Sequence, residues 1–365
     1  MAQWTFYRLD PKSGAGFHFG LRGLEGETSS EHCPSDTLFA ALVSTLADLD
    51  GDGAVRAFTA PFEAHSPPYL LTSLFPRAGD LPLLPRPFVR IEMETQPGQR
   101  KFLKRLCYVS PGIFRALLRG ERMDDLGPDS ANDQGRFLQG DRVWLRADEQ
   151  DALPDSWSAL DRKELREHKV WQSDPVDRVT IDRASSASAI YRVGRTTYAP
   201  GCGLWLGAQW PAGVDAAAAA QLETLLHHLG DRGLGGERSV GYGQFSINDD
   251  KAPSLDLPTT SGPYALSLSR YLPAEKELPG VLREDAAYGL VNVAGWMGSP
   301  QGAAYRRKGI RLLAEGSVLH TRGDLGPWGR LVDVKPDIWK KHPVWRYGYA
   351  CLVGVHPGAV EVQNA

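Results

Sequence analysis

Cysteine and long apolar runs are both scarce in this chain of 365 residues. The four cysteines, Cys33, Cys107, Cys202 and Cys351, lie far apart, and none belongs to a C-x-x-C pair or to a zinc-finger spacing. This argues against a structural zinc site and favours buried free thiols. No apolar run reaches the ~18 residues of a membrane span, and no secretory signal precedes Trp4, so we expect a soluble cytoplasmic protein without a membrane partner.

An excess of charge of either sign is also missing. The formal net charge is −3, so the chain is not a globally basic nucleic-acid binder, and any RNA site must be a local patch. The hydrophobic content of 42% supports a substantial core, and the length is enough for two domains. The 39 glycines and 26 prolines indicate many turns and long loops.

A pattern that would support catalysis is lacking as well. Acid–base chemistry needs a histidine with a nearby partner, but the histidines are scattered along the chain. Asp48, Asp50 and Asp52 cluster among glycines at the end of an expected helix, where a solvated turn is favoured over a two-metal site. We therefore expect no catalytic residue, no metal ion and no cofactor.

The most distinctive stretch is Gly230 to Ile247, with the sequence GDRGLGGERSVGYGQFSI. Upstream, residues 215–229 form helix by propensity, and Gly230 stands where a helix C-terminal glycine is expected. Downstream, Tyr242, Phe245 and Ile247 indicate a short strand. The glycine loop, residues 233–243, therefore joins the end of a helix to the start of a strand.

This order differs from that of nucleotide-binding loops, which run from a strand into a helix. Arg238 also occupies the position where the dinucleotide pattern needs its third glycine, and no G-K-[ST] follows. The loop therefore offers a glycine-rich backbone with few side chains, next to Arg232, Arg238 and Ser239. Such a loop can approach another backbone and offer N–H groups to phosphate, or it can be a flexible connector. The spacing alone leaves both interpretations open.

The order of expected elements predicts an α+β fold. A first strand spans residues 4–19, and a helix with Ser35 or Asp36 as its cap and a strand at 69–75 follow. Later, strands near Val179 and at 203–208 precede the 215–229 helix and the strand after the glycine loop. This suggests two degenerate βαββαβ units, that is, two ferredoxin-like (RRM-like) domains with insertions. We predict the domains to be residues 1–150 and 151–365.

Several motifs occur together in this order, and they are PSDTLFAAL at 34–42, LTSLFP at 71–76, RVTIDR at 178–183 with AIYRV at 189–193, and the glycine loop at 233–243. Residues 308–318, ending in Glu-Gly-Ser before a valine and leucine run, also fit. In this combination the chain resembles the RAMP superfamily of CRISPR effector subunits. Within that superfamily it is similar to the Cas-five-like subunits of type III-A complexes.

The resemblance implies a binding role rather than an enzymatic one. Such subunits bind the 5′ repeat-derived handle of the guide RNA (crRNA), cap one end of the filament of backbone RAMP subunits, and contact the large polymerase-like subunit, in antiviral defence. Three alternatives stay open. They are the equivalent type III-B subunit, a metal-independent RAMP endoribonuclease that processes precursor guide RNA, and a scaffold with incidental RNA contacts.

Single-stranded RNA is held by stacking on aromatic rings and by cations on its backbone, and two segments supply both residue types. Together with Ser35, at the start of the helix that resembles the family's first helix, they give the candidate RNA-binding residues Arg178, Arg183, Tyr191, Arg192, Gly233, Gly235, Gly236, Arg238, Ser239, Gly241 and Tyr242. For each arginine the alternative is a surface ion pair, and for each tyrosine it is core packing.

A partner surface is the remaining expectation. Residues 58–87 are rich in proline and apolar side chains, and Trp328, Trp339 and Trp345 follow late in the chain. As a subunit of a complex, the chain is expected to expose more apolar surface than a monomer tolerates, and these stretches are the candidates. The tryptophans fit a core position equally well.

Overall fold

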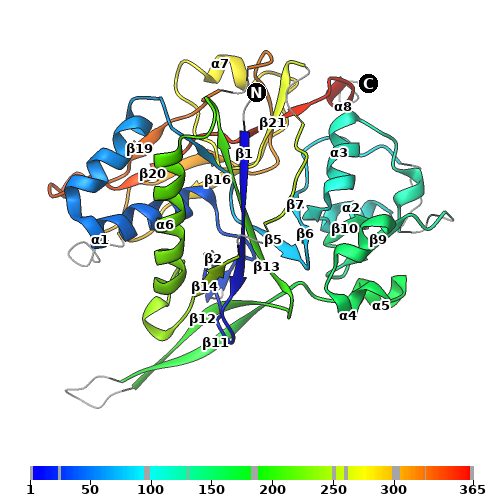
Figure 1. The fold of residues 1–365 in the computed structure, drawn as a ribbon, viewed down its shortest axis with the longest axis horizontal. Helices are drawn as coiled ribbons and strands as arrows, with labels where there is room; N and C mark the ends of the chain where they lie inside the picture. The colour runs from blue at the N-terminus through cyan, green and yellow to red at the C-terminus, as the bar shows by residue number, and fades with distance from the viewer. Residues whose placement is uncertain are drawn as a thin grey trace.

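The computed structural model describes residues 3–23, 26–93, 99–128, 130, 132–181, 188–248, 252–258, 262–297, 305–324 and 326–361. The chain folds as a mixed α+β protein around one central antiparallel sheet (Figure 1). Among the described residues, no helix is both long and apolar enough to cross a bilayer.

The central sheet has the strand order β14-β1-β13-β5-β6, with β4 paired to β13. Its strands are β1 (Gln3–Pro11), β4 (Leu70–Leu71), β5 (Phe75–Ala78), β6 (Leu81–Pro82), β13 (Cys202–Trp210) and β14 (Phe245–Ile247). Helix α1 (Ser35–Glu63) follows β1, and α6 (Ala216–Arg232) follows β13. The order strand, helix, strand, strand, helix, strand is therefore that of one ferredoxin-like unit.

The strands of this unit come from both sides of residue 150. Strand β13 pairs with β1 on one side and with β5 on the other, so the predicted division into residues 1–150 and 151–365 does not separate two sheets. The sheet crosses this boundary because strand pairing is set by long-range contacts, which the order of local patterns does not reveal, and the division into two domains stays a prediction. The first βαββαβ unit closes only at Ile247.

Strand β13 is buried along its whole length because it is covered on both faces. Leu204, Leu206 and Trp210 join the apolar cluster that α1 and α6 form over one face of the sheet. Trp205 belongs instead to a second apolar cluster, most of whose residues lie in the chain between β6 and β13 or in the C-terminal region. A buried strand of this kind is expected to be largely apolar, and the sequence CGLWLGAQW is apolar apart from Gln209.

Helix α1 differs from its predicted form at its start. Its N-cap is Pro34, which has no side-chain cap, so neither Ser35 nor Asp36 caps the helix. The first helical segment ends at Gly51, as expected, because the backbone there is non-helical with φ 77°, and a second segment follows directly. Asp48 of the first segment pairs with Arg232 of α6.

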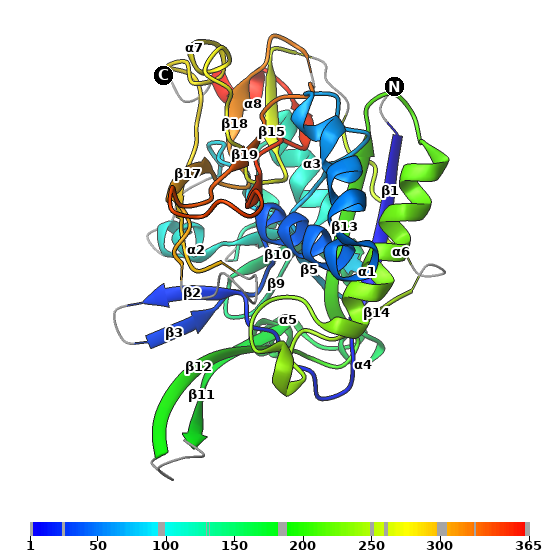
Figure 2. The ribbon, with the colours of Figure 1, turned by 90° about the vertical axis from the view of Figure 1, so that its left-hand side faces the viewer.

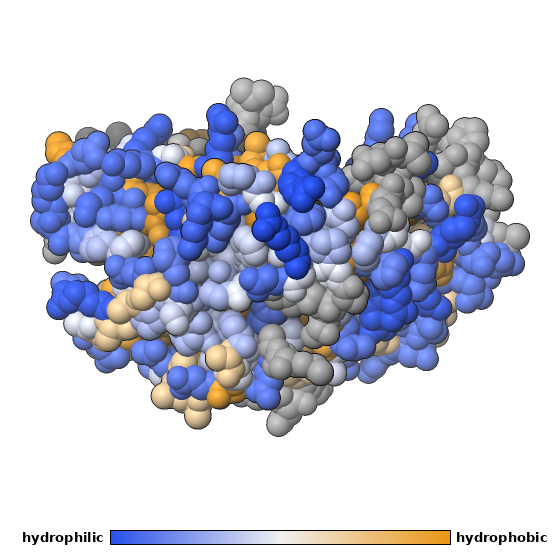
Figure 3. Space-filling view, turned by 90° about the horizontal axis from the view of Figure 1, so that it is seen from above, coloured by the Kyte–Doolittle hydropathy of each residue, from blue (hydrophilic) through white to orange (hydrophobic). Residues whose placement is uncertain are grey.

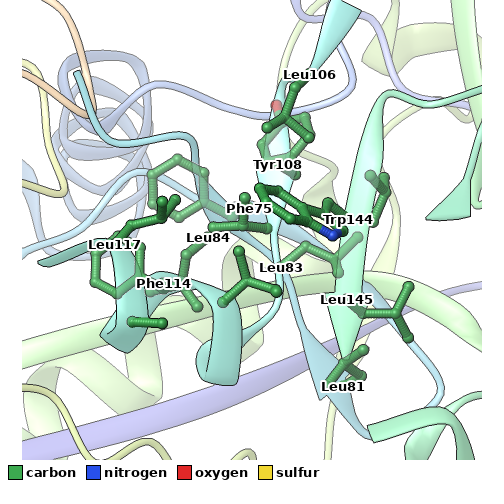
Figure 4. Packing of buried hydrophobic residues seen from close by; sticks show 14 of the residues in the cluster. Phe75, Leu81, Leu83, Leu84, Leu106, Tyr108, Phe114, Leu117, Trp144 and Leu145 are labelled. Carbon is green, nitrogen blue, oxygen red and sulfur yellow. The ribbon is translucent and has the colours of Figure 1, made fainter. Parts of the chain in front are cut away.

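A large insertion between β6 and β13 builds a separate lobe (Figure 1). Its elements are β7 (Leu84–Pro85), α2 (Gln99–Arg105), β8 (Tyr108–Val109), α3 (Pro111–Arg119), η1 (Asp124–Leu126), β9 (Gly135–Leu138), β10 (Val143–Arg146), η2 (Ala147–Ala152), α4 (Asp155–Ser158) and α5 (Arg162–Glu167). The strands form a sheet of order β7-β8-β10-β9. Figure 4 shows its core, in which Phe114 and Leu117 of α3 lie beside Leu83, Leu84 and Trp144.

Two hairpins project from the lower part of the molecule (Figure 2). The short one pairs β2 (Gly20–Gly23) with β3 (Gly26–Ser29), and the long one pairs β11 (Trp171–Ile181) with β12 (Ser188–Tyr198). The strand predicted near Val179 is thus confirmed. It lies in this hairpin, however, and not in the sheet of a second βαββαβ unit.

The C-terminal region is built from short strands. They are β15 (Tyr264–Ser267), β16 (Leu290–Val293), β17 (Ile310–Leu313), β18 (Val318–His320), β19 (Leu331–Asp333), β20 (Trp345–Tyr347) and β21 (Leu352–Val355). The helices α7 (Leu278–Val281) and α8 (Gly358–Glu361) are single turns. The strands pair as β18-β15-β21, β16-β17 and β19-β20. A second ferredoxin-like domain in this region stays a prediction.

The expected partner surface is not where the sequence suggested. The described side chains of residues 58–87 are mostly buried, and Trp339 is buried as well, because β4 to β7 supply the cores of both lobes. Seen from above, the face that carries α7 is mainly hydrophilic, with small separate apolar patches (Figure 3). Groups of large exposed apolar side chains lie instead on the β11–β12 hairpin and around β16, and single ones such as Ile338 lie elsewhere.

Candidate nucleic-acid interface

The helix before the glycine loop ends three residues later than expected. Helix α6 continues through Gly230, and Gly233 takes the C-cap position with φ 84°. A Cβ on Gly230 would lie 2.5 Å from the carbonyl oxygen of Phe245, so this glycine is needed for close packing of α6 on β14. The predicted role of Gly230 as the terminal glycine was therefore wrong.

The first half of the loop packs against the protein's own backbone. The amide of Gly236 donates to the His18 carbonyl oxygen at 2.9 Å, and Gly235 forms a parallel bridge with His18. A Cβ on Gly235 would lie 2.5 Å from that oxygen, and one on Gly236 would lie 2.6 Å from the His18 ring. These glycines admit the chain's own β1–β2 connection, and the Gly236 N–H is already occupied.

Gly233 and Gly243 also serve internal packing, since a Cβ on either would meet backbone oxygen closer than 2.5 Å. The amide of Leu234 donates to Gly243, and the amide of Gly243 donates to Gly16. The loop is therefore folded back on itself and on the β1–β2 connection rather than open to a ligand along its length.

The tip of the loop is exposed. It is the 3₁₀ turn η3 (Arg238–Val240), flanked by Glu237 and Gly241, both with a left-handed backbone. Arg238, Ser239 and Gly241 are exposed, and a Cβ on Gly241 would meet nothing within 4 Å. The accessible part of the candidate site in the loop is thus the tip, residues 238–241.

The hairpin supplies the second part of the site. Arg178 lies opposite Tyr191, and Asp177 lies opposite Arg192, in a regular antiparallel register. Tyr191 and Arg192 are exposed and Arg178 is partly exposed. Ile190 is 75% exposed and lies opposite Val179, which is 57% exposed, so the two form an exposed apolar pair on the hairpin.

The two parts meet at Tyr242. The guanidinium carbon of Arg178 lies 5.2 Å from the centre of the Tyr242 ring, and that of Arg195 lies 5.8 Å from it. Such cation–π contacts stabilise the pairing of strand and loop. The neighbouring Tyr242 raises the pKa of Arg178 above its ordinary value, so this side chain is fully cationic at neutral pH.

Tyr242 itself is only 5% exposed. Its ring is packed beneath the two arginines, so in this conformation it positions them and is not a platform for a base. Arg195 was not among the predicted residues. It stands two residues after Val193, on the same strand as Arg192, and the alternation of β12 was the only signal that could have found it.

The hairpin is anchored at its base by residues from the β1–β2 connection. The His18 ring is 2.7 Å from the carbonyl oxygen of Gly194, and Phe17 and Thr196 exchange backbone hydrogen bonds. His18 therefore touches both the hairpin, through its ring, and the glycine loop, through its carbonyl. This fixes the tip of the loop relative to the hairpin.

Two predicted residues are not in this interface. Ser35 is fully buried, where its hydroxyl accepts from the amide of Arg270 and its amide donates to Ser73, so it contacts no RNA in this conformation. Its motif is a packing feature that joins α1 to the C-terminal region. Arg183 lies outside the described residues.

Arg192 illustrates the alternative considered for every arginine. Its guanidinium donates to Asp177 at 2.9 Å, across the hairpin, and both side chains are well exposed. An exposed ion pair of this kind contributes little to the free energy of folding. Arg192 can therefore leave the Asp177 carboxylate and bind a phosphate with little loss of stability.

Among the residues that the structure describes, no three histidine, cysteine, aspartate or glutamate side chains form a group that could hold a metal ion. Cys33, Cys202 and Cys351 are buried free thiols, as expected, and Cys107 is half-buried. Burial raises the pKa of the Cys202 thiol to about 12, which keeps it protonated and unreactive.

The fold and the interface fit the class of protein that the sequence motifs suggested. A βαββαβ sheet whose second helix enters a glycine loop, next to a projecting arginine-bearing hairpin, is consistent with the RAMP fold. Residues 260–355 match the family model of the CRISPR Csm4 C-terminal domain. The chain resembles Csm4 proteins over most of its length.

The similarity to curated relatives spans nearly whole chains. The chain is 27% identical over 335 residues to Csm4 of Mycobacterium tuberculosis, covering 90% of this chain and 91% of that one. It is 26% identical over 337 residues to Csm4 of Streptococcus thermophilus, covering 90% and 93%.

Solved structures show the same fold. A chain of a Csm3–Csm4 subcomplex from a type III-A CRISPR-Cas interference complex superposes with a TM-score of 0.65 at 17% identity, covering 96% of this chain and 99% of that one. A chain of a Csm1–Csm4 cassette in complex with cA4 gives a TM-score of 0.53 at 16% identity, covering 98% of both.

Proposed function

We propose that this chain is the subunit of a type III-A CRISPR-Cas complex that binds the 5′ handle of the guide RNA without catalysing a reaction. It links the large polymerase-like subunit to the filament of backbone RAMP subunits, in the cytoplasm, as part of antiviral defence. The type III-B counterpart is the alternative assembly.

One observation carries the RNA-binding part of the proposal. Two separate segments, the hairpin with Arg178 and Arg192 and the loop tip with Arg238, are held together by Tyr242 beneath and by His18 at the base. Single-stranded RNA is bound by cations that contact its phosphates and by aromatic rings that stack on its bases. The arginines here are held beside an exposed aromatic ring, Tyr191, and so offer both kinds of contact. A chain with net charge −3 would use such a local patch for RNA.

The partners are proposed from the related proteins. The matched structures are a Csm3–Csm4 subcomplex and a Csm1–Csm4 cassette, in which the proteins so named are assembled with each other. By analogy, a backbone subunit and the large subunit are the expected partners of this chain. The exposed Ile190 and Val179 on the hairpin show that an apolar contact is available there.

The experiment that tests RNA specificity compares the handle RNA with an unrelated RNA of equal length. We expect the purified chain to bind the handle more tightly, and the Arg178→Ala variant to lose affinity for it. Arg283→Ala, an exposed arginine of the C-terminal region, is the matched control and should bind like the parent. Equal affinity for the two RNAs would favour a scaffold with incidental RNA contacts.

The same RNA separates binding from cleavage. A metal-independent RAMP endoribonuclease would cut a labelled repeat RNA at one site in the presence of EDTA. We expect the repeat RNA to be bound and recovered intact. Site-specific cleavage would replace the binding proposal by the enzymatic alternative.

A further inference from the structure

A second surface with RNA-binding chemistry lies in the C-terminal region, on the ribbon formed by β16 and β17. The exposed side chains on the first strand alternate with half-buried ones. The exposed row consists of Tyr288, Leu290, Asn292, Ala294 and Trp296. Within β16 this alternation places Leu290 and Asn292 on one face. Tyr288, Ala294 and Trp296 extend the exposed row beyond the two ends of the strand, over at most roughly 26 Å at about 3.3 Å per residue.

The second strand adds cations to the same face. Arg311 pairs across the ribbon with Asn292, and Arg306 forms a bridge with Trp296. The guanidinium carbon of Arg306 lies 4.9 Å from the centre of the Trp296 ring. Cross-strand partners share a face of the sheet, so both arginines stand beside the exposed row.

The large apolar side chains of this row are unusually exposed. Leu290 is 61% and Trp296 is 45% exposed, and Tyr288 is exposed as well. A row of this kind on a monomer's surface marks a binding site for some partner. Neither Arg306 nor Arg311 forms an ion pair within the part of the chain that the structure describes, which leaves their charges available.

The charge of the ribbon indicates which kind of partner it binds. Residues 288–313 contain four cations, Arg306, Arg307, Lys308 and Arg311, and no aspartate or glutamate. Lys308 is paired with Asp337 at 2.5 Å, and Arg307 donates to the Ala294 carbonyl oxygen, so Arg306 and Arg311 are the cations presented outward. Aromatic rings interleaved with arginines, on a strand face without carboxylates, match the chemistry that binds single-stranded RNA.

We propose that the exposed face of the β16–β17 ribbon binds a second stretch of single-stranded RNA, with Trp296 and Tyr288 stacking on bases and Arg306 and Arg311 contacting phosphates. The proposal rests on the proposed function, because it takes the chain to be an RNA-binding subunit. Figure 2 shows β17, the β2–β3 hairpin and the β11–β12 hairpin one below another along the same edge of the view. A strand held at the hairpin can therefore continue toward the ribbon.

The test compares the handle alone with the handle extended by about ten uridines at its 5′ or its 3′ end, a length within the usual range of single-strand sites. We expect one of the two extensions to increase the affinity of the parent chain. Trp296→Ala should reduce that increase by about tenfold, as expected for loss of one stacked base, and Trp296→Phe should restore most of it. Binding of the handle alone should not change in either variant.

Two matched controls keep the test specific. Ile338→Ala removes an apolar side chain that is 71% exposed outside the ribbon, and Lys276→Gln removes an exposed cation of the same region. Both variants should bind the extended RNA more tightly than the handle alone, to the same degree as the parent. Uridines replaced by 4-thiouridine in the extension should crosslink to the peptide that contains Trp296.

The outcomes distinguish this inference from the function on which it rests. If neither extension increases affinity, or if Trp296→Ala keeps the whole increase, the ribbon is not an RNA surface, while a loss of handle binding in Arg178→Ala would still support the proposed function. If ribbon variants lose binding to the large subunit and keep the increase, the ribbon is a protein interface and the proposal is overturned. If Arg178→Ala also binds handle like the parent, the proposed function fails separately.

Discussion

Gly235 and Gly241 have the same kind of backbone but different surroundings. Both have a left-handed φ, 99° and 85° respectively, so an alanine at either position is strained by about 1–2 kcal/mol. Only at Gly235 would the added Cβ also meet backbone, the His18 carbonyl oxygen at 2.5 Å. These residues therefore separate the conformational need for glycine from the need for space.

We predict that Gly235→Ala destabilises the protein by clearly more than Gly241→Ala does. The excess arises because the loop must move away from His18 to admit the methyl group. Urea denaturation of the two variants measures both effects. Equal losses of stability would mean that the loop does not depend on its contact with the β1–β2 connection.

Tyr242 gives a second prediction at this scale. Tyr242→Ala should weaken binding of handle RNA, because Arg178 and Arg195 lose the ring that positions them. Tyr242→Phe keeps the ring and should bind nearly like the parent. The two dissociation constants, measured at the same salt concentration, check this. A phenylalanine variant as weak as the alanine variant would assign the role to the hydroxyl group and not to the ring.

Single residues were predictable where local chemistry decided their place. Arg192, Tyr191 and Arg238 were predicted from their residue types and their places in the strand and the loop. All three are exposed, and their contact with RNA stays a prediction. Ser35 was not, because its burial depends on Arg270, which is more than two hundred positions away in the chain. Gly235 and Gly236 were chosen for a close approach, but the group that approaches is His18.

The β11–β12 hairpin carries its own prediction at the scale of elements. Asp177→Asn removes the partner of Arg192 and should strengthen RNA binding a few-fold at low salt, since the freed guanidinium can take a phosphate. Stability should change by no more than about 1 kcal/mol, as expected for an exposed pair.

Asp151→Asn, an exposed aspartate of the insertion lobe, controls for the general effect of removing one negative charge. The affinity gain should be larger at position 177 than at position 151, and it should shrink as salt increases. The same gain at both positions would show that Arg192 does not contact the RNA.

Elements were easier to predict than their pairing. The helix before the glycine loop and the strand after it were expected from propensity and from the alternation of Phe245 and Ile247, and both are present. The partners of that strand were not, because pairing with β1 joins residues that are more than two hundred positions apart. Similarly, β11 and β12 alternate like sheet strands, yet they form an isolated hairpin.

At the scale of the whole molecule, a buried ionic network joins the C-terminal region to the central unit. Arg270 and Arg346 both pair with the fully buried Asp36, and Glu315 accepts from Ser73 at 2.6 Å and lies 3.7 Å from His32. Burial opposes the ionisation of Glu315, but the neighbouring His32 ring, the charge of Arg270 and the hydrogen bond from the Ser73 hydroxyl outweigh it and lower its pKa to about 2.

This network predicts a pH dependence of stability. Because the folded pKa of Glu315 lies below its ordinary value of 4.5, its contribution is present above about pH 4.5 and is lost as the pH falls toward 2. The shift corresponds to roughly 3 kcal/mol. Glu315→Gln should therefore be less stable than the parent near pH 7, and the difference should narrow as the pH is lowered.

The exposed Glu223 of α6 provides the matched control, since Glu223→Gln should follow the parent at every pH. Denaturation of the three proteins between pH 7 and pH 2 gives the comparison. A stability gap for Glu315→Gln that stays constant over this range would mean that Glu315 is not held ionised by the network.

The central claim, that the hairpin and the loop tip grip one RNA backbone, is tested most directly by the salt dependence of handle binding. Arg178→Ala and Arg238→Ala should each lower the slope of log affinity against log salt by about 0.7, the value for one phosphate contact on a single strand. In the double variant this slope should fall by about twice as much as in either single variant. Parent-like slopes in both single variants would contradict the account, because the loop and hairpin would then be connectors and not an RNA interface.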